Sequence, residues 1–296
     1  MGSFDIIPGI SGGTIAFITG IYHELIKSID RFSFKKLMLG QFKILWSYIN
    51  GPFIISLLLG ILTGIFILSG VIIYLFDNYP ILISALIFGI VCGTFFVFVR
   101  LIKNKKIDDY FYLAISLTIS TCLTQLNSFD IEPSLIYLFF SSVIAISAMI
   151  LPGISGAMIF LILGVYNDIL SVIQNSVKVI INFNLQDFIK VYSKVFSITL
   201  GIIFGLKIFS KIVVWFFKNE RRKTLLILTG LIGGSLPKLW PLKDCMNIQT
   251  FFNILTLDKS YVICKSSEII ESVFFILAGV ILILIFNRIK KPIDYF

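Results

Sequence analysis

The sequence has few of the charged side chains on which soluble domains depend. Only 14% of its 296 residues are charged, whereas 57% are hydrophobic and the mean hydropathy is +0.99. No soluble domain is built from such a composition, so the chain is expected to be a polytopic membrane protein. The loops between its apolar stretches are too short to hold a separate soluble domain.

Histidine and closely spaced cysteines, the usual signs of a metal or redox site, are nearly absent. His23 is the only histidine, and no HExxH motif, CxxC motif or cysteine–histidine spacing occurs. Cys92 and Cys122 lie in apolar runs, where we expect them to fill the core. Cys245 and Cys264 flank one polar loop, and the sequence leaves open whether they form a disulfide. We therefore expect no cofactor and no metal, and enzyme signatures are lacking.

Basic residues exceed acidic ones, with 25 Lys and Arg against 16 Asp and Glu, which gives a net charge of +9. In a membrane protein such an excess usually marks cytoplasmic loops and does not indicate nucleic-acid binding. We therefore expect the membrane as a partner and no nucleic acid.

Apolar segments that could cross a hydrocarbon layer of ~30 Å recur along the chain. They lie at about 52–76, 80–102, 110–126, 134–150, 192–217, 224–240 and 268–287. Two further pieces, 10–22 and 154–166, have only about a dozen residues, which is too short for a span and typical of a re-entrant arm.

Nearly the same sequence occurs twice, at 7–22 and at 151–166, with nine of sixteen positions identical at a constant offset of 144. Each copy contains Pro-Gly-Ile-Ser-Gly. Proline suits the first turn of a helix and glycine permits a sharp reversal, so this run ends one helix and begins another. Glycine pairs four apart also recur, at an offset of 141, and favour an internal duplication. They are Gly60/Gly64 with Gly201/Gly205, and Gly89/Gly93 with Gly230/Gly234.

Three full spans lie between the two copies, and an odd number of spans inverts the second copy relative to the first. The sequence thus predicts an all-α, inverted-topology repeat with two opposed re-entrant helical hairpins, an architecture of secondary transporters. Residues 1–127 would form repeat one and residues 128–296 repeat two. Only seven residues precede Pro8, so the first arm of the first hairpin is expected to be truncated.

Basic residues gather in four clusters that this topology places on one face, whereas Asn127–Glu132 on the other face holds two acids and no base. The positive-inside rule then predicts that the basic loops and the C-terminus lie in the cytoplasm. The clusters are Lys27, Arg31, Lys35, Lys36 and Lys43; Arg100, Lys103, Lys105 and Lys106; Lys218, Arg221, Arg222 and Lys223; and Arg288, Lys290 and Lys291.

Each repeated motif can bind an anion, because the first N–H groups of a helix have no helical partner and carry partial positive charge. Two opposed hairpins would bring two such helix starts toward the midplane of the membrane. For either copy alone, a helix kink satisfied by serine and water explains the motif equally well. The candidate substrate-binding residues are Pro8, Gly9, Ser11, Gly12, Gly13, Thr14, Pro152, Gly153, Ser155 and Gly156.

Charged residues inside or beside apolar segments are costly and usually functional. Lys207, deep in segment 192–217, is added to the candidate substrate site. Asp5 is the one acid close to a motif, where it could carry a coupling proton or merely cap the broken helix. His23 and Glu24 are expected to form an interfacial polar cluster, and the pair Asp108–Asp109 to be solvated in a loop.

The chain resembles the polyprenyl-phosphate transporter family at Asp5–Thr14, Ile18–Tyr22, Ile150–Gly156 and Leu163–Tyr166. The resemblance covers essentially the whole chain. It implies a multi-pass protein of the plasma membrane that returns a polyprenyl monophosphate, undecaprenyl phosphate, from the outer to the cytoplasmic leaflet. The lipid is the carrier for cell-envelope glycan synthesis, such as that of the cell wall. Proton coupling through Asp5 would offset the cost of moving the anion inward.

Two alternatives stay open. Undecaprenyl-pyrophosphate phosphatases share the inverted repeat and a Pro-Gly-x-Ser motif, but theirs has arginine after the serine and a glutamate pair four residues apart. Here glycine follows both Ser11 and Ser155, and Glu268 and Glu271 are three apart. A carrier of a small soluble anion is the other alternative, and it would need a closed polar cavity.

Overall fold

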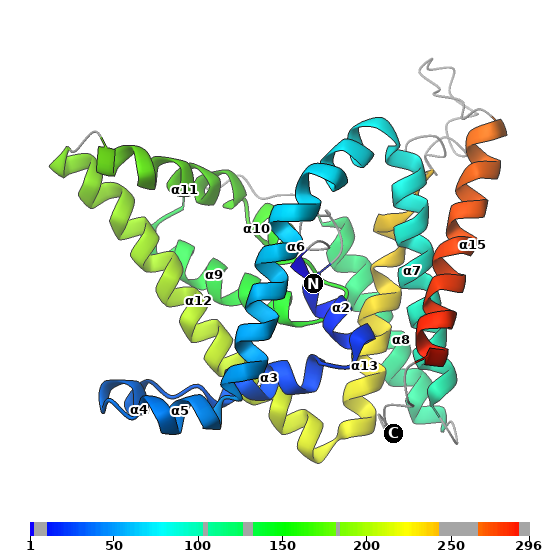
Figure 1. Ribbon diagram of the computed structural model, residues 1–296, viewed down its shortest axis with the longest axis horizontal. Helices are drawn as coiled ribbons and strands as arrows, with labels where there is room; N and C mark the ends of the chain where they lie inside the picture. The colour runs from blue at the N-terminus through cyan, green and yellow to red at the C-terminus, as the bar shows by residue number, and fades with distance from the viewer. Residues whose placement is uncertain (3–10, 103–105, 127–132, 182–183, 243–265, 290–296) are drawn as a thin grey trace.

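The computed structural model describes residues 1–2, 11–102, 106–126, 133–181, 184–242 and 266–289, and these residues form helices and the turns that join them (Figure 1). The all-α prediction is therefore confirmed for this part of the chain. The longer helices are α6 (Gly51–Asn78), α7 (Pro80–Leu101), α8 (Ile107–Gln125), α9 (Leu135–Ile150), α11 (Tyr166–Ile181), α12 (Leu185–Asn219), α13 (Arg221–Gly234) and α15 (Ser266–Ile289). The short elements are α2 (Gly12–Thr19), α3 (Tyr22–Arg31), α4 (Phe34–Met38), α5 (Phe42–Tyr48), α10 (Gly156–Ile162) and the 3-10 turn η1 (Leu236–Leu239).

Four of the described helices are long and apolar enough to cross a membrane: α6, α7, α12 and α15. The pair α10 and α11 would count as a fifth span if taken together, but the two helices are bent by 113°. The segment expected at 224–240 is shorter as a helix, since α13 ends at Gly234 and η1, with Pro237 near its start, follows. Proline removes a backbone donor, which favours a helix end here.

Glycines set the distance between the most extensively packed helices, which are α7 with α15, α12 with α9, and α13 with α8. A Cβ atom at Gly89 would lie 2.2 Å from the carbonyl oxygen of Ile276 on α15. At Gly201 it would lie 2.4 Å from the carbonyl oxygen of Phe139 on α9. Gly60 differs, because nothing lies within 4 Å of its added Cβ. The repeated glycine pairs therefore serve close packing on α7, α12 and α13, whereas the α6 face at Gly60 stays open.

Helix ends that carry or adjoin the basic clusters lie together in the lower part of Figure 1, where α3, α4, α5 and the α12–α13 turn are seen. An ion pair ties the start of α8 to the start of α13 at this end. Arg222 Nε donates to Asp109 Oδ1 at 3.1 Å, and its terminal nitrogen donates to Oδ2 at 2.5 Å. The expectation that Asp109 is solvated was therefore wrong: α8 already begins at Ile107, so Asp109 belongs to its first turn and is only 7% exposed.

Several predicted features lie outside the described residues, and one cysteine departs from expectation. Cys92 is half-buried, but Cys122 is exposed, so its expected role as core filler was wrong. The features outside the described part are Asp5, Pro8, Gly9, Asn127–Glu132 and the pair Cys245 and Cys264.

Candidate functional site

From the serine onward, the described parts of the two copies of the repeated motif follow the same order of local structure. In each, a serine in extended conformation precedes a short helix: Ser11 (φ −111°, ψ 146°) before α2, and Ser155 (φ −96°, ψ 131°) before α10. Each short helix is followed by a glycine in the left-handed conformation, Gly20 (φ 73°) or Gly164 (φ 70°). The repeated tyrosine then starts the next helix in both copies. The helix starts that the sequence predicts after Ser11 and Ser155 are present.

The second copy forms the tip of a helical hairpin. Helices α9 and α10 pack against each other on the two sides of residues 151–155. Their approach is close at Gly156, where an added Cβ would lie 3.2 Å from the carbonyl oxygen of Ala145. Glycine at this position lets the chain leave α9 and return beside it.

The first copy contacts this tip directly. The backbone N–H of Gly153 donates to Thr14 Oγ1 at 2.9 Å, and Ser11 Oγ donates to the carbonyl oxygen of Leu151 at 3.4 Å. Ser11 also caps α2 by accepting from the N–H of Thr14 at 3.3 Å. Ser11 and Thr14 are 3% and 2% exposed, so these bonds are made away from solvent. Residues far apart in the sequence are thus joined through the two copies of one motif.

Two glycines make this contact sterically feasible. A Cβ at Gly13 would lie 3.0 Å from the carbonyl oxygen of Ile150. Gly153 has φ +89° and would place a Cβ 2.4 Å from the carbonyl oxygen of Leu231 on α13. A side chain at Gly153 would therefore be strained by its backbone conformation and would collide with α13. The contact, defined here as residues 11–14 with 151–156, thus includes α13 as a third wall.

The chemistry of this motif contact follows from its donors and acceptors. The N–H of Gly153 and that of Thr14 are both satisfied, the first by the other copy and the second by Ser11. In this conformation the two copies bind each other. An anion could occupy the contact by replacing Thr14 Oγ1 as the acceptor of the Gly153 N–H, since charged acceptors make stronger hydrogen bonds than neutral ones.

Lys207 is bound elsewhere. Its ammonium donates to the carbonyl oxygens of Asp30 and of Phe32, the latter at 2.9 Å, and lies 4.0 Å from the Asp30 carboxylate. Both carbonyls belong to the C-terminal end of α3, where a cation is favoured by the helix dipole. The structure therefore attaches Lys207 to the end of α3, and these contacts do not include the motif residues.

A basic cavity of about 570 Å³ lies beside α3 and was not anticipated from the sequence. Its lining includes His23 and Lys27 from α3, Lys218 from the end of α12 and Arg221 from the start of α13. Tyr22 lines it as well. Burial, followed by the charges of Lys27 and Arg221, lowers the pKa of His23, and Glu24 opposes that shift. In the sequence, the one indication of this cavity is the repeated tyrosine close to basic residues. Which residues of α12 complete the lining depends on the packing of α3 against α12.

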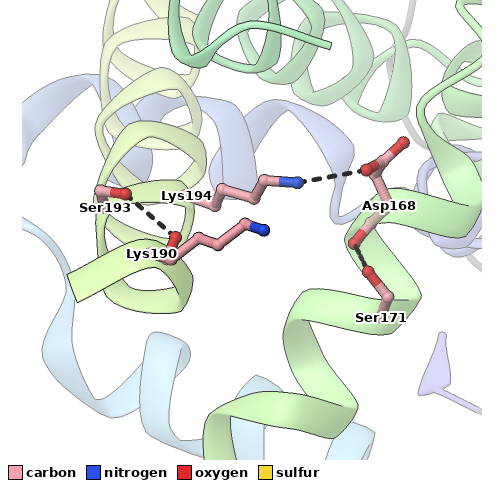
Figure 2. A network of polar contacts seen from close by, with 5 residues as sticks. All are labelled: Asp168, Ser171, Lys190, Ser193 and Lys194. Carbon is pink, nitrogen blue, oxygen red and sulfur yellow. Dashed lines mark hydrogen bonds and ion pairs between the residues drawn. The ribbon is translucent and has the colours of Figure 1, made fainter. Parts of the chain in front are cut away.

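Two residues after the repeated tyrosine, the second copy has an acid that forms an ion pair with a lysine. Lys194 on α12 reaches across to Asp168 on α11, with Nζ 3.3 Å from Oδ1, and Lys190 lies one turn before Lys194 (Figure 2). In the first copy, Glu24 occupies the position two residues after the tyrosine and accepts from the side-chain amide of Asn50. The first copy therefore leads into a cavity whose lining includes three permanent cations, Lys27, Lys218 and Arg221.

Comparisons with known proteins agree with one another. Residues 1–253 match the family described as VCA0040-like, undecaprenyl phosphate translocase-like. The chain is similar to a polyprenyl-phosphate transporter of Vibrio cholerae, with 37% identity over 250 residues, 83% of this chain and 77% of that protein. A polyprenyl-phosphate transporter of Staphylococcus aureus is 29% identical over 254 residues, covering 81% of this chain and 83% of that protein. No solved structure matches the chain.

Proposed function

The chain belongs to the undecaprenyl phosphate translocase-like family, and we propose that it returns undecaprenyl phosphate from the outer to the cytoplasmic leaflet for use in envelope glycan synthesis. It is a membrane transporter of polyprenyl phosphate and not an enzyme. Its long apolar helices suit a multi-pass membrane protein.

We propose the motif contact as the place where the phosphate head group passes between the leaflets. The observation that carries this is the buried hydrogen bond from Gly153 to Thr14. A head-group oxygen would displace the Thr14 hydroxyl, bind the N–H of Gly153 and reach the start of α2. Pro8, Gly9, Pro152 and Ser155 would hold the two helix breaks in shape, and Lys207 would keep α3 in position beside them.

The proposed architecture is an inverted repeat of residues 1–127 and 128–296 with two re-entrant hairpins. Helix pairing supports it, because α7, the second span of the first half, packs on α15, the third span of the second half. The reciprocal pair, α13 with α8, is packed in the same way. The basic helix ends and the C-terminus would face the cytoplasm. Cysteine labelling tests this topology, since residues 28–50 and 127–133 should then react from opposite sides.

Proton coupling through Asp5 is part of the proposal. Moving a dianion inward against a negative-inside potential costs ~2.3 kcal/mol per charge per 100 mV. A phosphate monoester with a second pKa of ~6 can carry one proton itself, and Asp5 would supply a second. Replacing Asp5 by asparagine should weaken the response of transport to an imposed pH gradient. An unchanged response would remove Asp5 from the mechanism.

Reconstitution decides the function itself. Purified protein in liposomes, given a labelled polyprenyl phosphate in one leaflet, should speed its movement to the other leaflet over protein-free liposomes. Release of inorganic phosphate from undecaprenyl pyrophosphate would favour the phosphatase alternative. Transport of a soluble phosphate without movement of the lipid would favour the small-anion carrier.

A further inference from the structure

We propose that the basic cavity beside α3 is a second binding site for a phosphate monoester, separate from the motif contact, and that it receives the head group at the basic end of the protein. This inference rests on the proposed function, because it takes the transported lipid as the source of the phosphate. The cavity is lined by Lys27, Lys218 and Arg221, with His23 beside them and Glu24 as the one acid.

Charge is the first argument for a phosphate. Three permanent cations and one carboxylate give the lining a net charge of about +2, which matches a dianionic phosphate monoester. Lys27 and Lys218 belong to different elements, α3 and α12, and both are exposed. Within the described part of the chain neither forms an ion pair with an acidic side chain. Their charges are therefore available to a ligand that enters between them.

The second, independent argument is the hydroxyl of Tyr22. Tyr22 is 1% exposed, lines the cavity, and has the one buried side-chain polar atom without a hydrogen-bond partner among the described residues. Buried tyrosine hydroxyls usually find a partner, and an unmet one costs free energy. A phosphate oxygen is a strong acceptor and would complete it. Tyr166, the equivalent tyrosine of the second copy, is half-buried.

The position of the cavity connects it with the motif contact. Helix α2 begins beside Ser11 at the contact, and Phe17 and Gly20 at its other end line the cavity. At 1.5 Å per residue, the path from Ser11 to Gly20 is ~13 Å. A head group released from the contact and moving along α2 would therefore arrive among the cations.

An apolar pocket beside α3, the helix that also carries Lys27, favours a lipid as the source of the phosphate. The pocket, of about 260 Å³, is lined by Ile29 of α3, by Phe32 directly after that helix, and by Ile203 and Leu206 of α12. A free phosphate gains nothing from an apolar surface, whereas a prenyl chain attached to the phosphate can bury apolar surface there.

Binding to the full chain in lipid nanodiscs tests the site, with farnesyl phosphate as the lipid probe and inorganic phosphate as the soluble one. Lys27→Gln and Lys218→Gln should each weaken farnesyl phosphate binding by about tenfold, since a hydrogen bond to a charged group is lost. Lys178→Gln removes the same charge from an exposed position on α11 and should leave binding unchanged. Equal affinity of both cavity variants and the control would overturn the proposal.

Tyr22→Phe separates a ligand-binding hydroxyl from one that is merely unpaired. If the hydroxyl binds phosphate, the variant should bind farnesyl phosphate several-fold more weakly, although without ligand it should be at least as stable as wild type because an unpartnered buried hydroxyl is removed. If binding stays at the wild-type level, the hydroxyl has no ligand and the site is wrong. Inorganic phosphate competing as well as farnesyl phosphate would assign the cavity to the free anion.

Translocation by the wild-type protein distinguishes failure of this site from failure of the proposed function. If wild type moves polyprenyl phosphate between leaflets and the cavity variants bind it normally, only the second site is refuted. If wild type moves no polyprenyl phosphate, the proposed function fails. Binding of inorganic phosphate, compared between wild type and the cavity variants, then shows whether the cavity is a phosphate site at all.

Discussion

The hydroxyl oxygen of Thr14 accepts a hydrogen bond from the backbone N–H of Gly153 at 2.9 Å, across 139 positions of sequence. This bond joins the two copies of the repeated motif, but only one copy can supply the acceptor. The position equivalent to Thr14 in the second copy is Met158, which has no hydroxyl. The duplicated motifs therefore meet in an asymmetric contact, and the first copy carries the group that a ligand would displace.

Replacement of Thr14 by valine should destabilise the protein by about 1–3 kcal/mol, because the buried N–H of Gly153 loses its partner while the shape of the side chain is kept. Thermal unfolding in detergent measures this. Thr14→Ser retains the hydroxyl and should recover most of the loss. Thr19→Val is the matched control, since Thr19 only bonds to carbonyls of its own helix. Equal effects of the valine substitutions at the two threonines would contradict a special role for Thr14.

Gly153→Ala should abolish correct packing of the hairpin tip. The left-handed conformation alone costs an alanine ~1–2 kcal/mol, and its Cβ would meet the carbonyl oxygen of Leu231 at 2.4 Å. Gly60→Ala makes the same chemical change on α6, where nothing lies within 4 Å, and should be neutral or stabilising by up to ~1 kcal/mol. Folded yield and thermal midpoint of the two variants provide the comparison.

The all-α membrane character and the helix starts at the two motifs could be predicted because each depends on local signals. Composition indicates membrane helices, and Pro-Gly-x-Ser-Gly ends one helix and begins another whatever surrounds it. The partners of charged side chains could not be predicted. The depth of Lys207 in an apolar segment predicts a place at the substrate site, but it gives no sign that the end of α3 lies beside this lysine and supplies two carbonyl acceptors.

The basic cavity shows the same limit. Lys27 and Lys218 are 191 positions apart, and each looks in the sequence like an ordinary positive-inside residue. Their common cavity arises because α3 packs against α12. Tyr22 gives a weak signal as a repeated residue, but only the folded chain buries its hydroxyl without a partner.

Lys207→Met should loosen α3 more than it affects the motif contact. Loss of a cation at a helix C-terminus costs ~0.3–1 kcal/mol, and hydrogen exchange of α3 should rise while that of α10 stays the same. Lys211→Met, one turn further along α12 and exposed, is the control. Faster exchange confined to α10 would instead place Lys207 at the motif contact.

Asp109→Asn should reduce the acid sensitivity of the protein. The hydrogen bond from Arg222 is the main cause that lowers the pKa of Asp109, and the backbone N–H of Lys106 adds to it. A carboxylate with a lowered pKa stabilises the fold above its unfolded pKa of ~3.9 and loses that contribution as pH falls through its folded pKa. Thermal midpoints between pH 7 and pH 3 should therefore fall more steeply for wild type than for the variant. Asp108→Asn, at the exposed neighbouring position, should follow wild type.

His23 should report on the charge of the basic cavity, and because it is the only histidine its titration can be followed without assignment. Burial, Lys27 and Arg221 lower its pKa, so the NMR signal of a labelled sample should titrate with a midpoint below the usual value of ~6.5. Lys27→Gln removes a positive charge that disfavours the imidazolium and should raise the midpoint. Glu24→Gln removes an opposing negative charge and should lower it further.

A phosphate bound in the cavity should raise the titration midpoint of His23, whereas the neighbouring cations lower it. A dianion close to His23 favours the protonated imidazole, so farnesyl phosphate should raise the midpoint in wild type. In the Lys27→Gln, Lys218→Gln double variant, which should bind the ligand poorly, the added ligand should leave the midpoint where it was. A ligand-independent midpoint in wild type, under conditions where farnesyl phosphate is bound, would mean that the phosphate lies at the motif contact and not beside His23.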